Sequence, residues 1–293
     1  MTAANVPAPT MDQQRKPRFW RRRGSSFGGL IVWGLVGLFF LFVFALIATV
    51  VLDSFATTWF GSWLPDAFTS HWYGDAWAEF NLTDVLFVTA QVAISVVIIS
   101  ALIGVPAAYA LARRNFPGKR VITVLFLLPI LIPPITYGIP LATVLYKVHL
   151  AGSLEGVILA NLVPTVPFVV LVMIPFIEQI DPKVEAAARM CGASTLTIFL
   201  RILGPLLVPG ILAASILVLV RTVGMFELTF LTSGPTSSTI VVVLYSAVFG
   251  AGIRAPQEVD AMAVVYTASM LVLLVVALRF VNPTQLVTRV SSD

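Results

Sequence analysis

The stretch that decides the fold lies past the middle of the chain. It reads Asp181-Pro182-Lys183-Val184-Glu185-Ala186-Ala187-Ala188-Arg189-Met190-Cys191-Gly192-Ala193-Ser194-Thr195-Leu196-Thr197-Ile198-Phe199-Leu200-Arg201-Ile202-Leu203-Gly204-Pro205. Uncharged, strongly apolar runs flank its polar part, over residues 156–177 and 202–220. A polar segment between two such runs is typical of a loop that joins two membrane-spanning helices.

This loop is itself predicted to be helical. Asp181 can cap a helix and Pro182 suits the first helical position, so we expect a short Ala-rich helix over residues 182–191. Gly192 can take the left-handed conformation that ends a helix, and Ser194 can cap a second helix over residues 195–203. The small Ala and Gly side chains would let another protein approach closely. An ordinary structured loop is the alternative.

The composition excludes a soluble domain. Charged residues make up 11% of the 293 residues and hydrophobic residues 58%, whereas soluble domains carry about 25% charged residues. One cysteine, Cys191, and two histidines, His71 and His149, exclude a disulfide scaffold and a Cys- or His-rich metal centre, so we expect no metal. On so apolar a chain, the net charge of +4 indicates how the chain is oriented in the membrane rather than binding to phosphates, so we expect no nucleic-acid partner.

Long uncharged runs place the spanning helices. A span needs about 20 apolar residues, because the hydrocarbon core is about 30 Å thick. The runs predict an all-α membrane protein with six transmembrane helices, at about residues 27–52, 85–112, 121–146, 156–177, 205–230 and 261–281. The first run exceeds the roughly 7–15 apolar residues of a signal peptide, so we expect it to remain as a helix. Residues 1–26 form a basic tail, residues 27–281 the six-helix domain and residues 282–293 a C-terminal tail.

A further uncharged run, residues 228–253, is not predicted to span. The segment Thr232-Ser233-Gly234-Pro235-Thr236-Ser237-Ser238 interrupts it and predicts a loop. Only residues 240–249 remain, about 15 Å of helix, which is too short to cross the membrane. We expect a short interfacial or re-entrant helix on the outer side, between the last two spans.

The distribution of charge predicts that both termini are cytoplasmic. Fifteen of the 18 Lys and Arg residues lie in the two tails, in the loops at residues 113–120 and 178–201, and at Arg279 near the end of the last span. With six spans, all of these segments lie on the same side of the membrane. Lys and Arg are enriched in cytoplasmic loops, so we expect this side to be the cytoplasm. The outer segment, residues 53–84, contains five carboxylates, no Lys or Arg, and four of the six tryptophans. It predicts an aromatic belt, a docking surface for an extracytoplasmic partner, or both.

The sequence contains no catalytic motif. Gly118-Lys119 is followed by Arg120 and lacks the upstream glycine of a phosphate-binding loop. Neither His-Glu-x-x-His nor Gly-x-Ser-x-Gly occurs. The predicted spans offer no paired carboxylates and no His/Cys pair for catalysis within the membrane. We therefore expect a protein that is not an enzyme, so that another subunit would supply the energy for any uphill transport.

The central loop resembles the Glu-Ala-Ala…Gly pattern in permease subunits of binding-protein-dependent ABC importers of the type I group. The resemblance covers about residues 85–281, including residues 107–118, which are similar to the family's Ala-Tyr-Ala-Leu-Ala-Arg…Phe-x-Gly-Lys pattern. Residues 199–209 resemble its apolar stretch that closes in Leu-Pro. Two positions depart from the pattern. Counting back from Gly192, the usual Glu falls on Ala186, one position after Glu185, and the terminal Leu is Gly204.

The resemblance implies what the loop does and what it contacts. In this family it forms the coupling helix, which sits in a groove of a cytoplasmic ATPase and moves as ATP closes the ATPase dimer. The coupling residues implied here are Glu185, Ala186, Ala187, Ala188, Gly192, Ala193 and Ser194. Also implied are a second permease, which we expect to be paralogous, two ATPase subunits that bind ATP and Mg, and an extracytoplasmic substrate-binding protein. The chain itself would bind no cofactor, and its location would be the bacterial inner membrane.

Polar side chains within the spans mark a candidate substrate route, because such groups are costly in lipid and usually face a bundle interior or cavity. The candidates are Gln91, Ser95, Tyr137, Asn161, Arg221, Glu227, Tyr245 and Tyr266. If the fifth span begins near Pro205, Arg221 lies about 24 Å along it, in its outer third. Arg221 is then a pathway or gate residue, or it snorkels outward or pairs with Glu227 or Asp260. Glu227 is the best candidate for contact with a cationic or hydroxylated substrate.

Short patterns also resemble the spermidine/putrescine-type branch of the family. These are Trp72-Tyr73, the loop that ends in Ser-Gly-Pro, and Tyr245-Ser246 followed by residues 255–261. The resemblance implies uptake of a polyamine or a similar cationic compound, with a sugar or sugar alcohol as the alternative. An ion-driven secondary transporter would favour an inverted repeat and midplane carboxylates, neither of which is evident. A scaffold protein would not need the coupling loop.

Overall fold

The structure, a computed structural model, describes residues 26–250 and 254–279. The regular elements among these residues are helices, apart from one isolated β-bridge between Ala56 and Phe68, and this confirms the predicted all-α class. The elements are α1 (Ser26–Asp53), α2 (His71–Glu79), α3 (Leu82–Arg113), α4 (Lys119–Leu131), α5 (Pro134–Lys147), α6 (Leu154–Glu178), α7 (Pro182–Met190), α8 (Thr195–Ile198), the π-helical η1 (Phe199–Leu203), α9 (Gly204–Val223), α10 (Glu227–Thr232), α11 (Ile240–Phe249) and α12 (Pro256–Arg279).

Five helical stretches are long and apolar enough to cross a membrane. They are Gly29–Asp53 within α1, α3, α6, Thr195–Val223, which joins α8, η1 and α9, and α12. The number of candidate spans rises to six if the bent pair of α4 and α5 is counted as one span. The number of apolar spans agrees with the predicted class, whereas the predicted tails, residues 1–26 and 282–293, lie outside the described residues except for Ser26.

The chain divides into two units, and most of α1, up to Ala48, belongs to the first, whereas the described residues from Thr49 onward belong to the second. In the first unit the described apolar side chains are exposed nearly without interruption, for example Trp33 at 77% and Phe44 at 69%. A helix that is apolar on every side is suited to lipid or to a second apolar surface.

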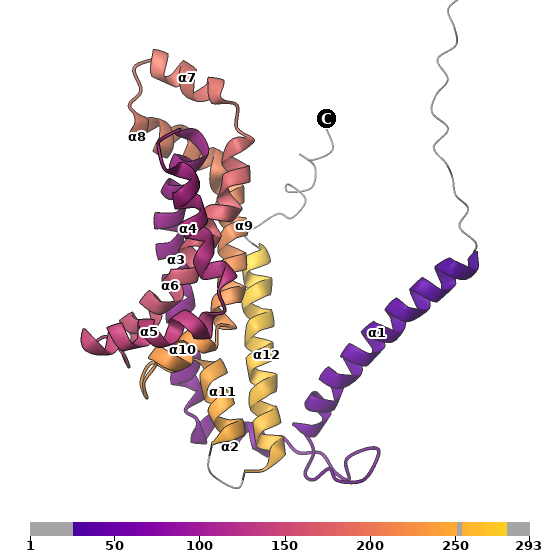
Figure 1. Cartoon of the computed structure of the whole chain (residues 1–293). Coiled ribbons are helices and arrows are strands. Elements are labelled where there is room, and N and C mark those ends of the chain that lie inside the picture. Colours follow the sequence, from indigo (N-terminus) through magenta and orange to yellow (C-terminus); the bar gives the residue numbers. More distant parts are fainter. Residues whose placement is uncertain (1–25, 251–253, 280–293) are drawn as a thin grey trace, which may run out of the picture. The chain divides into compact units, whose positions relative to one another are not determined.

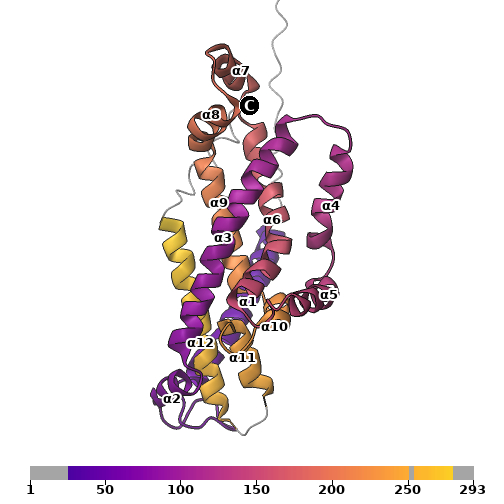
Figure 2. The ribbon, with the colours of Figure 1, turned by 90° about the vertical axis from the view of Figure 1, so that its left-hand side faces the viewer.

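Three helices of the second unit, α3, α6 and α9, run side by side and enclose its main core (Figures 1 and 2). Val96 of α3, Met173 of α6 and Val218 of α9 are fully buried there. Gly104 allows α3 to approach α6 closely, because a Cβ atom at this position would lie 2.7 Å from Cγ1 of Val169. The helices α7 and α8 lie at one end of this bundle, and α2 and α11 lie at the other.

The third predicted span, residues 121–146, differs from the structure. The axes of α4 and α5 meet at 99°, so the run is not one straight helix. Pro133 and Pro134 lack the N–H groups that would continue the helix, and a proline ring disfavours helical geometry in the residue before it. Accordingly Ile132 is extended, with φ −84° and ψ 133°. The double proline makes this segment a broken span or a re-entrant element.

The fifth predicted span, residues 205–230, also differs. Here α9 ends at Val223 and the short α10 follows from Glu227. The N–H of Met225 bonds the carbonyl of Thr222 at 3.1 Å, which tightens the last turn next to Gly224. The predicted loop after α10 and the short helix at residues 240–249 match the structure. Residues 53–84 contain a helix that was not predicted, α2, and α12 begins five residues earlier than expected.

Candidate functional site

The helix–turn–helix at residues 181–203 has the capping that its sequence predicts. The Asp181 side chain accepts a hydrogen bond from the N–H of Lys183 at 2.9 Å, and Pro182 is the first residue of α7. Gly192 has φ +81°, the left-handed region, and the Ser194 hydroxyl accepts from the N–H of Thr197 at 3.2 Å. These caps hold α7 and α8 as a defined unit at the end of the bundle (Figure 1).

One face of this unit presents small and apolar side chains to the outside. Ala186, Ala187, Gly192 and Ser194 are exposed, while Ala188 and Ala193 are half-buried. The flanking Met190 is 90% exposed and Leu196 66%. Apolar exposure of this kind at the end of a bundle marks an interaction surface. Six of the seven predicted coupling residues therefore lie at or near this surface.

Glu185, the seventh, points into the chain instead. It is 3% exposed, and its Oε1 lies 2.8 Å from Nε of Arg113. The hydroxyl of Tyr109 donates to its Oε2 at 2.8 Å, and the more exposed Arg189 lies 3.4 Å from the same oxygen. Both residues lie in the stretch 107–118 that resembles the family pattern, and Arg113 begins the loop predicted at residues 113–120, but sequence reasoning gave neither of them a role. The carboxylate of Glu185 is thus placed for contacts within this chain.

A second polar group gathers around Arg221 of α9. Its guanidinium lies 5.4 Å from the ring centre of Phe168 in α6. Within the described part of the chain, Arg221 Nε and the Tyr137 hydroxyl are buried without a hydrogen-bond partner. Tyr137 of α5 lies within electrostatic range of both Arg221 and Glu227. The structure therefore brings together three of the predicted pathway residues, from α5, α9 and α10.

Arg221 does not form either of the ion pairs considered for it. Among residues 26–250 and 254–279, no carboxylate lies within 4.0 Å of its guanidinium. Asp260 instead borders a small pocket together with Asp53 and Trp59. A half-buried guanidinium that has donors to spare can bind oxygen atoms of a solute.

Asn161 has a structural contact rather than an open position. Its Nδ2 donates to the carbonyl of Val157 at 2.9 Å and to Oγ1 of Thr229 at 3.2 Å, and the residue is 1% exposed. The hydrogen bond to Thr229 joins α6 to α10, because Thr229 lies on α10, two residues after Glu227. Asn161 therefore positions the segment that carries Glu227.

Tyr245 belongs to a group of aromatic rings on α11, on α10 and at Phe226, which caps α10, and sequence reasoning missed this group. Ring centres are 4.6 Å apart between Tyr245 and Phe226, 5.4 Å between Tyr245 and Phe230, and 4.7 Å between Tyr245 and Phe249. The i, i+4 spacing within each pair, Phe226 with Phe230 and Tyr245 with Phe249, could have indicated it. Of the remaining candidates, Gln91 and Ser95 are half-buried on α3, and Tyr266 is half-buried on α12.

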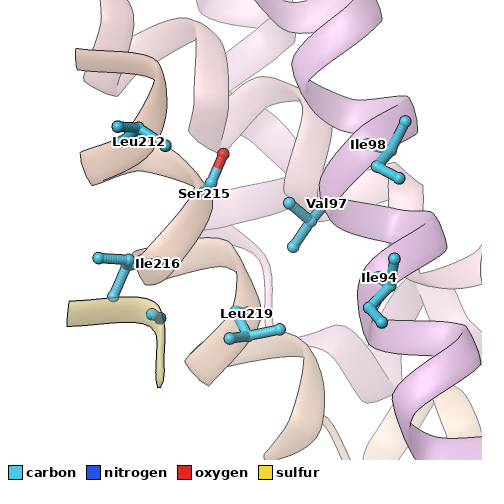
Figure 3. A pocket seen from close by; sticks show the side chains of 8 residues that line it. Ile94, Val97, Ile98, Leu212, Ser215, Ile216 and Leu219 are labelled. Atoms are coloured by element: carbon cyan, nitrogen blue, oxygen red, sulfur yellow. The ribbon is translucent and has the colours of Figure 1, made fainter. Parts of the chain in front are cut away.

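The groove between α3 and α9 does not suit a polar solute. It is lined by apolar side chains and one hydroxyl, that of Ser215 (Figure 3), namely Ile94, Val97, Ile98, Leu212, Ile216, Leu219 and Ala277. Such a surface fits acyl chains or another apolar helix. Nor do the described residues include a group of three or more His, Cys, Asp or Glu side chains that could hold a metal ion.

Comparison with known proteins gives matches to transport proteins. The family model for "Binding-protein-dependent transport system inner membrane component" matches residues 100–283. The molybdenum transport system permease protein ModB of Haemophilus influenzae is 33% identical over 172 residues, which are 53% of this chain and 75% of that protein. The diacetylchitobiose uptake system permease protein NgcG of Streptomyces coelicolor is 28% identical over 193 residues, 64% of this chain and 61% of that protein.

For several other curated relatives, the matched part spans only 51% to 53% of the relative's length. Among solved structures, a bacterial ABC transporter for import of the acidic polysaccharide alginate has a TM-score of 0.74 at 18% identity, with 89% of this chain and 98% of that chain covered. At this identity the likeness shows a shared fold. These names concern molybdenum and carbohydrates, so the predicted polyamine branch has no support from them.

Proposed function

The chain belongs to the family of binding-protein-dependent transport system inner membrane components, and we propose that it forms half of the solute pathway of an ABC importer. It is a multi-pass permease subunit of the inner membrane. The observation that carries the proposal is the capped helix–turn–helix of α7 and α8, with its exposed small-residue surface at one end of the spanning helices.

In this proposal the surface around Ala186 and Ala187 docks on a cytoplasmic ATPase subunit. ATP and Mg are bound and ATP is hydrolysed by two such subunits, whereas this chain moves in response. A second permease, paralogous or identical, supplies the other half of the pathway. An extracytoplasmic binding protein delivers the solute to the end of the bundle that carries α2 and α11. In this proposal the movement of the chain is a rigid-body switch between two packed states.

We further propose that the solute is rich in oxygen atoms, either a sugar or an oxyanion. The Arg221 guanidinium and the Tyr137 hydroxyl both donate hydrogen bonds, and each has a buried polar atom free of a partner among the described residues. Oxygen acceptors would satisfy these donors, whereas the ammonium groups of a polyamine would be repelled by Arg221. Glu227 is the one acidic member of this group, and it would accept from a sugar hydroxyl.

The first experiment identifies the solute. The binding protein that functions with this chain is isolated, and its bound ligand is determined by mass spectrometry. Uptake of labelled sugar, molybdate or sulfate, and spermidine is then measured in proteoliposomes that contain the complete complex. We expect uptake of an oxygen-rich solute that depends on ATP. Uptake of spermidine alone would contradict the proposed substrate class without affecting the assignment as a permease.

The second experiment tests the docking surface. An Ala187→Trp variant places a large ring on the exposed face of α7, so we expect the ATPase subunits to be lost from the purified complex. Gly74→Trp is the matched control, because Gly74 of α2 faces open space at the opposite end of the bundle. Retention of the ATPase subunits by the Ala187→Trp complex would show that this surface does not dock them.

A further inference from the structure

The buried carboxylate of Glu185 ties the coupling segment to α3. One oxygen of Glu185 lies 2.8 Å from Nε of Arg113, and the other accepts a hydrogen bond of 2.8 Å from the Tyr109 hydroxyl. Tyr109 and Arg113 are four residues apart on α3, and therefore lie on one face of the helix, a turn apart. The Arg113 and Glu185 side chains are only 13% and 4% exposed. A single residue of α7 is thus held by two residues of α3.

Arg113 also holds the end of α6. Its Nη2 donates a hydrogen bond of 2.9 Å to the carbonyl of Ile177, and it donates a second one to the carbonyl of Ile180. The Ile177 carbonyl also accepts from the N–H of Ile180 at 3.2 Å, so the Arg113 guanidinium adds to the bonding at the turn that ends α6. The guanidinium of Arg113 therefore joins three elements, α3, the C-terminal end of α6, and α7.

The second limb of the helix–turn–helix is attached at the same place. The ring of Phe199, at the start of η1, lies 5.4 Å from the ring of Tyr109, and the neighbouring Ile198 is fully buried. Both limbs, α7 and α8 with η1, are therefore fastened around Tyr109. A displacement of α7 alone would have to break the ion pair and the hydroxyl contact together, and a displacement of both limbs would also break the ring packing.

We propose that Tyr109, Arg113 and Glu185 form a clamp that makes α7 and the adjoining ends of α3 and α6 move as one rigid piece. Separating the Arg113–Glu185 pair would leave a charge buried without a partner, which is strongly unfavourable, so the clamp resists opening when α7 is pulled. This inference rests on the proposed function, since it requires that an ATPase subunit moves α7. Glu185 is then a positioning residue, and the exposed small residues make the contact with the ATPase.

The test uses the complete importer in proteoliposomes, with its second permease, ATPase subunits and binding protein. Glu185→Gln removes the charge at nearly constant shape, and Tyr109→Phe removes one hydroxyl only. Glu178→Gln is the matched control, because Glu178 is an exposed carboxylate seven residues from Glu185. Three quantities are measured for each variant, namely the ATPase subunits retained in the complex, the rate of ATP hydrolysis, and the solute molecules taken up per ATP hydrolysed.

We expect the Glu185→Gln complex to keep its ATPase subunits and to hydrolyse ATP, while solute uptake per ATP falls about 5- to 150-fold, the usual range of coupling between sites. Tyr109→Phe is expected to show a smaller fall in the same ratio, and Glu178→Gln none. An unchanged ratio in Glu185→Gln would overturn the clamp, and so would loss of the ATPase subunits, which would indicate a direct contact.

Two controls keep the result interpretable. If the Glu185→Gln chain does not fold, the Tyr109→Phe ratio decides, because removing one hydroxyl leaves the ion pair intact. A double variant, Tyr109→Phe with Glu185→Gln, is expected to lower the ratio no further than Glu185→Gln alone, because the Tyr109 hydroxyl acts through the Glu185 carboxylate; a further fall in the double variant would argue against a shared contact. Failure of the proposed function gives a different result, since the unaltered complex would then show no uptake driven by ATP.

Discussion

The contact between α3 and α6 at Gly104 gives the most quantitative prediction. An added Cβ atom would lie 2.7 Å from Cγ1 and 2.8 Å from Cβ of Val169, and 3.4 Å from the carbonyl oxygen of Val166. Carbon atoms in contact lie at about 3.5–4.0 Å. The Gly104→Ala variant must therefore move the two helices apart by about 1 Å, or distort Val169, along the main core of the second unit.

The expected cost is that of overpacking, about 1–3 kcal/mol in the free energy of unfolding. The matched control is Gly37→Ala in α1, since a Cβ atom there has nothing within 4 Å and the glycine also lies inside a spanning helix. The comparison cancels the gain in helix propensity that replacing any helical glycine brings, up to about 1 kcal/mol. The prediction is therefore a difference of about 1–3 kcal/mol between the two variants.

Unfolding is measured by circular dichroism as SDS is titrated into the purified chain in mild detergent. Adding Val169→Ala to Gly104→Ala removes the nearest methyl group, so the double variant should be more stable than the sum of the single effects predicts. If Gly104→Ala and Gly37→Ala change the free energy of unfolding by amounts that agree within about 0.5 kcal/mol, the close approach of α3 and α6 is refuted.

Three further predictions concern single residues of the two sites. Gly192→Ala forces a side chain into the left-handed conformation, at a cost of about 1–2 kcal/mol, so ATP hydrolysis stimulated by the binding protein should fall. Gly192→Asn should retain a higher rate of hydrolysis than Gly192→Ala. Equal rates in the two variants would contradict the role of the turn. Asn161→Ala removes the bond to Thr229 and should lower the free energy of unfolding by about 0.6–1.7 kcal/mol, with no added loss from Thr229→Val; an additive double variant would argue against this contact. Arg221→Gln should lower solute uptake while the ATPase subunits stay attached, and Arg221→Lys should restore part of it; normal uptake by Arg221→Gln would exclude Arg221 from the pathway.

The predictions from sequence succeeded where local chemistry decides the structure. The caps at Asp181 and Ser194 and the turn at Gly192 form as expected, because each depends on a side chain and the backbone within three residues of it. The long apolar runs also became helices, because a spanning segment must satisfy its backbone hydrogen bonds internally. The double proline at Pro133 and Pro134 was equally visible in the sequence but was not used in the prediction, and the third predicted span bends by 99° there.

The candidate site shows which features could not be predicted from the sequence alone. Arg221, Tyr137 and Glu227 could be named as polar residues in spans, but which of them lie together depends on how α5, α9 and α10 pack. The pairing of Arg221 with Asp260 was one option by sequence, and the packing places Asp260 beside Asp53 instead. The aromatic rings around Tyr245 are close for the same reason, since α10 and α11 meet only after the loop folds back.

The sequence by itself determined that this is an all-helical membrane protein with five to six apolar spans, and where the helix–turn–helix at residues 181–203 begins and turns. These properties follow from hydrophobicity and from short-range hydrogen bonding. Only the tertiary structure decided the direction of Glu185. Its neighbour Ala186 faces outward, whereas the Glu185 carboxylate is buried against Tyr109 and Arg113, 76 and 72 positions away. A buried charge needs a partner, and the packing of α3 against α6 and α7 supplies it.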